Sequence, residues 1–115
     1  MIASVVAIEE RLSQYIRNYA DDRRCLVELL RFLGKHPYTR FSRSAVVHAL
    51  KNQRVYVERS LKYLIANGVV SWASENKIHL YSLTEDGPDR NWALDLARLD
   101  WCQWQVVLRQ VDSME

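Results

Sequence analysis

Apolar side chains recur every three or four residues along most of the chain, and this spacing predicts helices. Residues 1–20 show it first and are expected to form one amphipathic helix. A second helix is expected over 21–34, where Asp21 or Asp22 can accept from the exposed backbone N–H groups of its first turn. Gly34 marks the expected end of this helix, because glycine is common just past the last helical turn.

Two further helices are expected close together in the middle of the chain. The apolar pattern predicts a short helix over 44–50 and a longer one over 53–66, with a polar turn at 51–53 between them. Gly68 closes the longer helix, since glycine readily takes the left-handed backbone conformation of a helix end. The sequence therefore predicts a pair of helices joined by a tight turn.

The apolar period changes from 3.6 to 2 after this pair of helices. The alternation over 69–74 and 77–83 predicts a β-hairpin with its turn at 75–76. Pro88 then suits the first turn of a helix, and one long helix is expected from there to about residue 111. Two apolar stripes lie on this helix, so we expect it to pack against its own domain and against a second copy of the chain.

The composition fits one compact, mainly helical domain. A chain of 115 residues is the size of one domain, and its 49% hydrophobic content is typical of a globular protein. With 3 Gly and 2 Pro it has few positions for the tight turns of a β-sandwich. No apolar run approaches the roughly 20 residues of a membrane span, and the start of the chain does not resemble a secretory signal, so a cytoplasmic location is expected.

The residue pattern indicates neither catalysis nor metal binding. Cys25 and Cys102 lie far apart in expected helices, which predicts two buried thiols and no disulfide. The three histidines do not have the spacing of metal ligands. The sequence shows no Gly-rich phosphate loop, no clustered carboxylates and no nucleophile beside a base. We therefore expect no enzyme activity, no metal and no cofactor.

Basic residues are concentrated in one segment. Residues 35–66 hold seven Lys or Arg and a single acid, Glu58, whereas the formal net charge of the whole chain is only +2. The rest of the chain is therefore net negative. A basic segment with acidic flanks indicates that one face of the protein attracts a polyanion.

From residue 23 to 87 the order of elements resembles a winged helix-turn-helix domain, most closely that of the MarR/PadR-like transcriptional regulators. The resemblance rests on VERSLKYLIANGVV at 57–70, a helix that ends at a glycine before a strand, and on YSLTEDG at 81–87, which is similar to the end of the wing. The turn at 51–53 departs from the family pattern in having no glycine, and the wing tip carries one basic residue, Lys77. The resemblance implies a mainly α fold with a small β-hairpin, divided into an N-terminal dimerisation helix at 1–20, a winged helix-turn-helix domain at 21–87 and a C-terminal dimerisation helix at 88–115.

In such a domain the longer helix of the pair, about 53–66, enters the major groove of double-stranded DNA. Side chains near its start reach base edges, where arginine suits guanine and glutamine suits adenine. The expected base contacts are Gln53, Arg54 and Tyr56. Basic side chains around them would bind phosphates, which position the protein without reading the base sequence. The expected phosphate contacts are Arg40, Arg43, Lys51, Arg59, Lys62 and Lys77.

The surplus apolar faces of the terminal helices predict a homodimer. The expected interface residues are Val5, Ile8, Leu12, Tyr15, Tyr19, Leu94, Trp101, Trp104 and Leu108. The aromatic residues could instead line a pocket for a small-molecule effector, but packing is the preferred interpretation because no charged group is expected to converge there. Tyr63 is expected to cover the wing, and Glu58 to form a helix-supporting pair with Lys62.

Two functions fit this pattern best, and a non-specific architectural chromatin protein is a third, for which a net charge of +2 is modest. We expect a dimeric, sequence-specific, DNA-binding transcriptional regulator whose operator is an inverted repeat. The alternative is a winged-helix module that docks another protein, because one fold hosts many functions. The short, weakly basic wing favours this alternative. Dependence of DNA affinity on salt and on base sequence separates the two.

Overall fold

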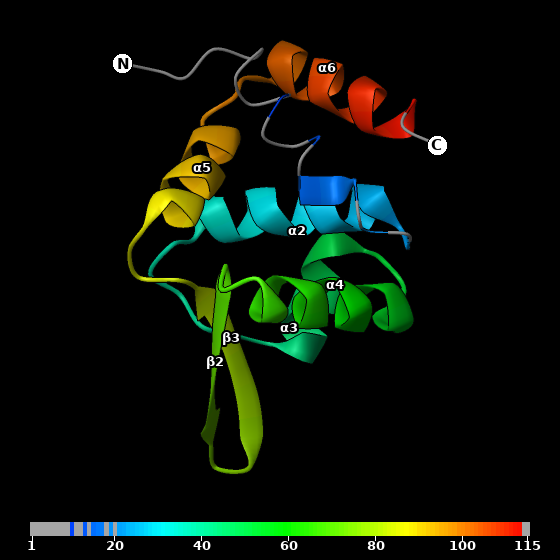
Figure 1. Ribbon diagram of the computed structural model, residues 1–115. Coiled ribbons are helices and arrows are strands. Elements are labelled where there is room, and N and C mark those ends of the chain that lie inside the picture. Colours follow the sequence, from blue (N-terminus) through cyan, green and yellow to red (C-terminus); the bar gives the residue numbers. More distant parts are fainter. Residues whose placement is uncertain (1–9, 11–12, 14, 18, 20, 114–115) are drawn as a thin grey trace.

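The computed structural model describes residues 10, 13, 15–17, 19 and 21–113. The helix predicted over 1–20 therefore lies mostly outside the described residues. The elements of the described part are, in order, α2 (Arg23–Lys35), β1 (Phe41–Ser42), α3 (Arg43–Leu50), α4 (Arg54–Ala66), β2 (Val70–Glu75), β3 (Ile78–Leu83), α5 (Pro88–Ala97) and α6 (Trp101–Asp112) (Figure 1).

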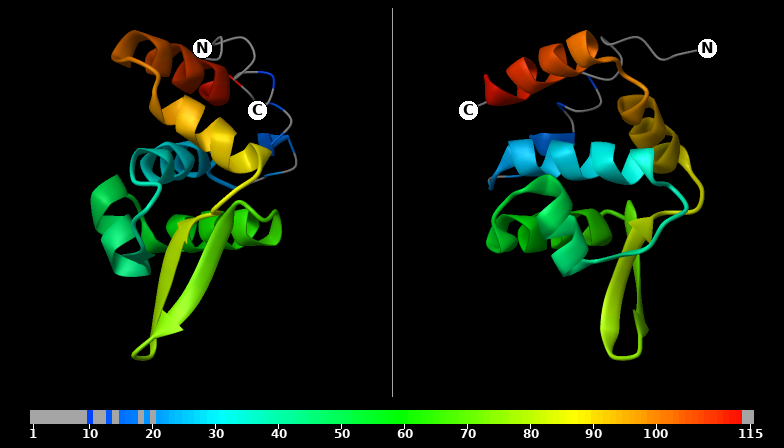
Figure 2. Two further views of the ribbon diagram at one scale, coloured as in Figure 1. Left: turned by 90° about the vertical axis from the view of Figure 1, so that its left-hand side faces the viewer. Right: turned by 180° about the vertical axis from the view of Figure 1, so that it is seen from behind.

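Helix α2 runs through the middle of the molecule. Helices α3 and α4 lie on one side of it, α6 lies on the other, and α5 packs across one end (Figures 1 and 2). Asp22 caps α2 as predicted, with its Oδ1 accepting from the backbone N–H of Cys25 at 3.0 Å. Because α2 has neighbours on several sides, its fully buried side chains point in several directions. They are Cys25, Leu26, Val27, Leu29, Leu30 and Leu33.

Gly34 lies inside α2, whereas the sequence pattern placed it at the helix end. The helix continues to Lys35 and is capped by His36. A Cβ atom on Gly34 would collide with the backbone carbonyl oxygen of Ala93 and would lie 3.0 Å from Cβ of Ala97. Gly34 therefore permits the close approach of α2 and α5.

The turn between α3 and α4 is closed without a glycine. Lys51 takes the left-handed conformation, with φ 52° and ψ 42°, which glycine adopts at less cost. The side-chain oxygen of Asn52 accepts from the backbone N–H of Gln53 at 2.7 Å, just before α4 begins. The predicted pair of helices with a tight turn is confirmed.

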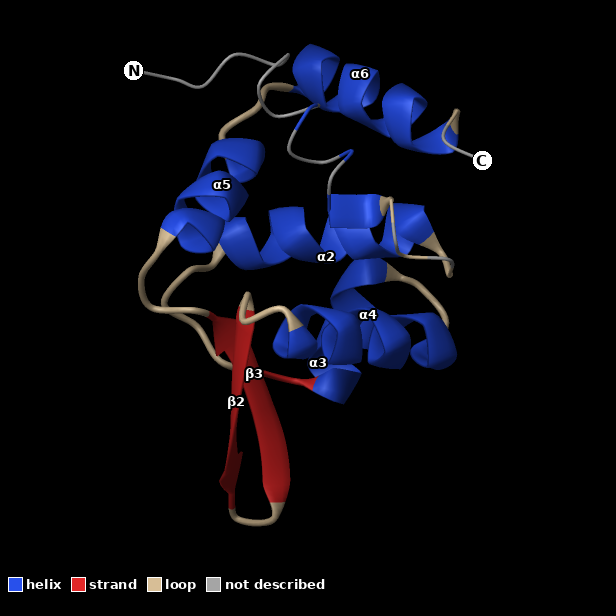
Figure 3. Ribbon diagram, viewed as in Figure 1, coloured by secondary structure: helices blue, strands red, loops and turns tan. Residues whose placement is uncertain are grey.

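The three strands form one antiparallel sheet in the order β1-β3-β2, and its hairpin projects from the helical body (Figure 3). The hairpin turn is Asn76-Lys77, one residue later than predicted, and both residues have positive φ, at 50° and 67°, as a type I′ turn requires. The sequence pattern missed β1, which pairs Phe41 with Tyr81, because a strand of two residues has no period to detect. Three helices followed by this hairpin confirm the winged helix-turn-helix fold.

The single C-terminal helix predicted from residue 88 is wrong, because the chain forms α5 and α6 there with a break at 98–100. A capping box at Asp100 begins α6. Its Oδ1 accepts from the backbone N–H of Gln103 at 2.8 Å, and the Gln103 side chain accepts from the backbone N–H of Asp100 at 3.0 Å. These two bonds satisfy backbone N–H groups that have no partner within the helix at its N-terminus. Apolar spacing continues through the break and therefore hides it.

Candidate nucleic-acid interface

Helix α4 has one buried side and one free side. The buried side carries Val57, Ser60, Leu61 and Leu64. At 3.6 residues per turn, Val55 and Lys62 lie on the opposite side of the helix. Both are exposed, Val55 to 43%. An exposed helix face of this length has the dimensions needed to enter the major groove of DNA.

Two of the three predicted base contacts lie on free surface at the start of α4. Gln53 is the N-cap residue, and its exposed side chain makes no capping hydrogen bond. The Arg54 side chain is 62% exposed. Tyr56, in contrast, is half-buried and packs against the core. Its side chain therefore contacts its own domain, which leaves less of it exposed for a base.

Val55 was missed in the sequence analysis. The sequence did carry a signal for it, because Val55 is apolar, lies in the first turn of α4 and does not belong to the buried stripe of that helix. Its methyl groups have the chemistry to contact the methyl group of a thymine. The free surface at the start of α4 therefore combines an amide, a guanidinium and an apolar side chain.

Glu58 joins α3 to α4 through two ion pairs. Its Oε1 lies 3.0 Å from Nη1 of Arg43 and 3.3 Å from Nε of Arg54. The predicted pairing of Glu58 with Lys62 is therefore wrong. Glu58 is 35% exposed and Arg43 38%, so this cluster is at the surface and partly shielded from water.

The other candidate phosphate contacts divide into two groups. Arg40 pairs with Glu75 at 3.7 Å and Arg59 with Asp21 at 2.9 Å, so two cations already have an acidic partner. The remaining three are exposed and form no ion pair with any residue that the structure describes: Lys51, Lys62 and Lys77. Exposed lysines of this kind can neutralise DNA phosphates, which releases the counterions condensed on the DNA.

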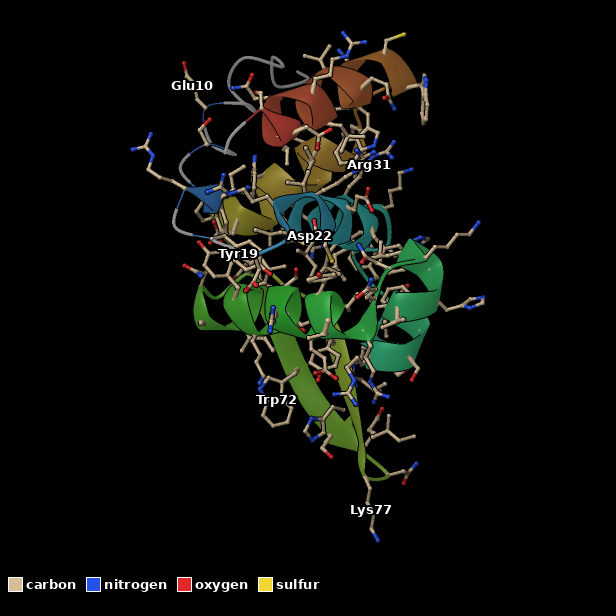
Figure 4. All side chains as sticks on the ribbon, turned by 90° about the vertical axis from the view of Figure 1, so that its right-hand side faces the viewer. Glu10, Tyr19, Asp22, Arg31, Trp72 and Lys77 are labelled. Atoms are coloured by element: carbon tan, nitrogen blue, oxygen red, sulfur yellow. The ribbon has the colours of Figure 1, made fainter. Side chains whose placement is uncertain are left out.

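A groove of about 360 Å³ lies between the start of α3 and the wing. Its lining residues are Ser42, Arg43, Ser44, Lys77, Ile78, His79 and Tyr81. Lys77 stands at the far end of the hairpin and Trp72 on its flank (Figure 4). Trp72 is 52% exposed, and its ring packs on His79 with 4.8 Å between ring centres. Hydroxyl groups and cations in one groove have the chemistry to bind the sugar–phosphate backbone.

Tyr15 and Tyr19 pack against the flank of α4. The Tyr63 hydroxyl donates to the backbone oxygen of Tyr15 at 2.6 Å, so Tyr63 does not cover the wing as predicted. The hydroxyl groups of Tyr19 and Ser60 share a hydrogen bond of 3.0 Å. Burial raises the pKa of the Tyr19 hydroxyl above its usual value.

The residues expected at a dimer interface have different environments in the single chain. Three lie outside the described residues: Val5, Ile8 and Leu12. Three are at most 5% exposed and belong to the core of the chain, which leaves them little surface for a second copy: Tyr19, Trp104 and Leu108. Tyr15 and Leu94 are half-buried, and Trp101 is 70% exposed. Trp101 therefore offers the largest free surface of those described.

Two predictions about side-chain environment are corrected in the same region. Cys25 is buried as expected, and burial raises the pKa of its thiol to about 11, but Cys102 is exposed on α6. A charged group does converge on one tryptophan, since the Arg31 guanidinium carbon lies 4.4 Å from the centre of the Trp104 ring. Both line a pocket of about 230 Å³ between α2, α3 and α6.

The described residues contain no group of three or more His, Cys, Asp or Glu side chains that could hold a metal ion. None of the helices in the described part of the chain is both long enough and apolar enough to cross a bilayer.

Comparison with known proteins identifies the fold. No family model matches the chain, and no curated protein matches its sequence. Among solved structures, the chain is similar to the heme-free form of PefR, with a TM-score of 0.50 and 17% identity over 95% of this chain and 90% of that chain. It is also similar to the heme sensor protein PefR from Streptococcus agalactiae in complex with heme, with a TM-score of 0.50 and 18% identity over 95% of this chain and 71% of that chain. At these identities the likeness shows a shared fold.

Proposed function

We propose that this chain is a sequence-specific DNA-binding transcriptional regulator that acts as a homodimer. The single observation that carries the proposal is the exposed start of α4, formed by Gln53, Arg54 and Val55, with Lys51 exposed in the turn before the helix and Lys62 exposed farther along it. Recognition helices of this fold read base edges with the residues of their first turns. Gln53 and Arg54 contact bases in this proposal, whereas Tyr56 supports the helix from the core.

Phosphate binding is assigned to the cations that surround α4. Lys51, Lys62 and Lys77 are exposed and can neutralise phosphates, which releases counterions from the DNA, and the groove that Arg43 lines leads from α3 to the wing. Arg40 and Arg59 contribute after exchanging their acidic partners for phosphates. The ion pairs of both are at the surface, where such pairs contribute at most about 1 kcal/mol.

The experiment that tests this function is fluorescence anisotropy with a pool of random-sequence duplexes at two salt concentrations, followed by sequencing of the retained fraction. We expect enrichment of an inverted repeat with half-sites about 10 base pairs apart and an affinity that falls steeply with salt. Weak binding without enrichment would contradict the proposal and would favour the alternative, a winged-helix module that docks another protein.

The dimer has its own test on α6. Trp101 is 70% exposed and Val106 43%, and both belong to that helix. Aromatic surface of this kind is typical of the buried centre of protein interfaces. We expect the wild-type chain to sediment as a dimer at micromolar concentration and Trp101→Glu to sediment as a monomer.

A matched control separates loss of the interface from a general effect of adding charge. Tyr38 is 91% exposed and lies between α2 and β1, so Tyr38→Glu should remain dimeric. A wild-type monomer, or a Trp101→Glu variant that still dimerises, would contradict the assignment of α6 to the interface.

A further inference from the structure

Glu58 is the one acidic side chain of α4, and two arginines fix it in place. Arg43 approaches from the start of α3 and Arg54 from the first turn of α4 itself. Both of these contacts end on the same carboxylate oxygen, Oε1, at 3.0 Å and 3.3 Å. The described residues make no hydrogen bond to the second oxygen, Oε2. The cluster therefore holds an acceptor oxygen in a defined position on the surface of α4.

An acid on a DNA-binding helix carries a cost, because phosphates repel it. Here the two guanidinium groups offset that repulsion, so the cluster as a whole is positive. They also restrict the rotamers of Glu58, which lowers the entropy lost when the side chain makes a further contact. An ordinary helix-supporting pair needs one cation, whereas this carboxylate has two.

The chemistry of the free oxygen selects its partner. In the major groove, cytosine presents an amino group that donates, and glutamate side chains accept from it. Thymine presents a carbonyl oxygen at the corresponding place, which repels a carboxylate. Adenine also presents an amino donor, but a side chain that both donates and accepts pairs with adenine better than a carboxylate does.

We propose that Glu58 determines part of the base specificity by accepting, through Oε2, from the N4 amino group of a cytosine. Arg43 is a positioning residue for this contact, and Arg54 both holds Glu58 and contacts its own base. The inference rests on the proposed function, because it requires α4 to lie in the major groove.

The test compares wild-type protein with Glu58→Gln on the operator obtained by selection and on duplexes that carry each single base-pair change. We expect the wild type to prefer cytosine over thymine at one position by about tenfold, within the range of a specific base contact. Glutamine both donates and accepts, so Glu58→Gln should lose this preference and favour adenine at the same position.

A uniform rise in the affinity of Glu58→Gln for every duplex, with unchanged base preferences, would overturn the inference. Glu58 would then only lower DNA affinity by repelling phosphates. Failure of the proposed function gives a different result, in which the wild type enriches no sequence at all. The control Glu28→Gln removes one acid from α2, where Glu28 pairs with Arg24 at 3.1 Å, and should keep the wild-type base profile. Thermal unfolding of both variants checks that each is folded.

Discussion

Gly34→Ala is expected to lower the free energy of unfolding by about 3 kcal/mol, the upper part of the range for overpacked cores. The added Cβ would fall on the backbone of Ala93, and backbone atoms cannot rotate away as a side chain can. Relief therefore requires the backbones of α2 and α5 to move apart where Gly34 meets Ala93. Alanine favours a helix over glycine by about 1 kcal/mol, which opposes the effect without cancelling it.

Urea unfolding followed by circular dichroism measures this change, at one fixed protein concentration because dimerisation would shift the midpoint. Gly68→Ala is the matched control. Gly68 has φ 75°, and a Cβ there would meet no atom within 4 Å, so the cost is backbone strain of about 1–2 kcal/mol. If Gly34→Ala were the milder of the two, the close packing of α2 on α5 would be contradicted.

Arg54→Ala is expected to weaken binding to the selected operator by about 1–3 kcal/mol while affecting random DNA much less. Arg54 is the first residue of α4, and its side chain has the length and the donor pair to bond both acceptors of a guanine. Loss of such a bidentate contact relaxes specificity at the base pair that Arg54 itself contacts. Anisotropy titrations with operator and random duplexes under the same salt conditions measure both effects.

Arg98→Ala provides the control for Arg54→Ala. The Arg98 side chain is 60% exposed and forms an ion pair with Asp95 of α5. It therefore matches Arg54 in charge, in exposure and in having one nearby acid of its own helix. Arg98 is the C-cap residue of α5, and Figure 1 shows α5 away from α4. Equal losses for Arg54→Ala and Arg98→Ala would show that net charge alone governs binding. Lys62→Ala should instead weaken binding to all duplexes alike and reduce the salt slope by about one.

The fold was predictable because its elements differ in period. Helices with a buried stripe and a hairpin with alternating positions leave different patterns, and Gly68 and Pro88 mark boundaries through backbone constraints that are local. The break before α6 was missed although its signal was present. Asp100 and Gln103 have the spacing of a capping box, and this local chemistry outweighed an apolar stripe that continued across it.

The partners of the site residues were less predictable than their exposure. Periodicity tells which side of α4 faces solvent, but it does not say what approaches from elsewhere in the fold. Arg59 pairs with Asp21, which lies 38 positions away, and Glu58 selects Arg43 over the nearby Lys62. Half-burial of Tyr56 likewise depends on how the domain packs around α4. Such contacts follow from the tertiary structure and leave no periodic signal.

The contacts on the flank of α4 also bear on the half-site spacing that a proposed dimer of these domains could accept. Arg59, Ser60 and Tyr63 lie within about one helical turn, and they fasten α4 to Asp21, Tyr19 and Tyr15. In the proposed function Arg59 exchanges Asp21 for a phosphate, so the Tyr19–Ser60 and Tyr63–Tyr15 hydrogen bonds are the contacts that keep Tyr15 and Tyr19 on α4 when DNA is bound. A movement of Tyr15 and Tyr19 would then move α4 with them, and in the proposed homodimer it would change the half-site spacing that the two α4 helices can reach.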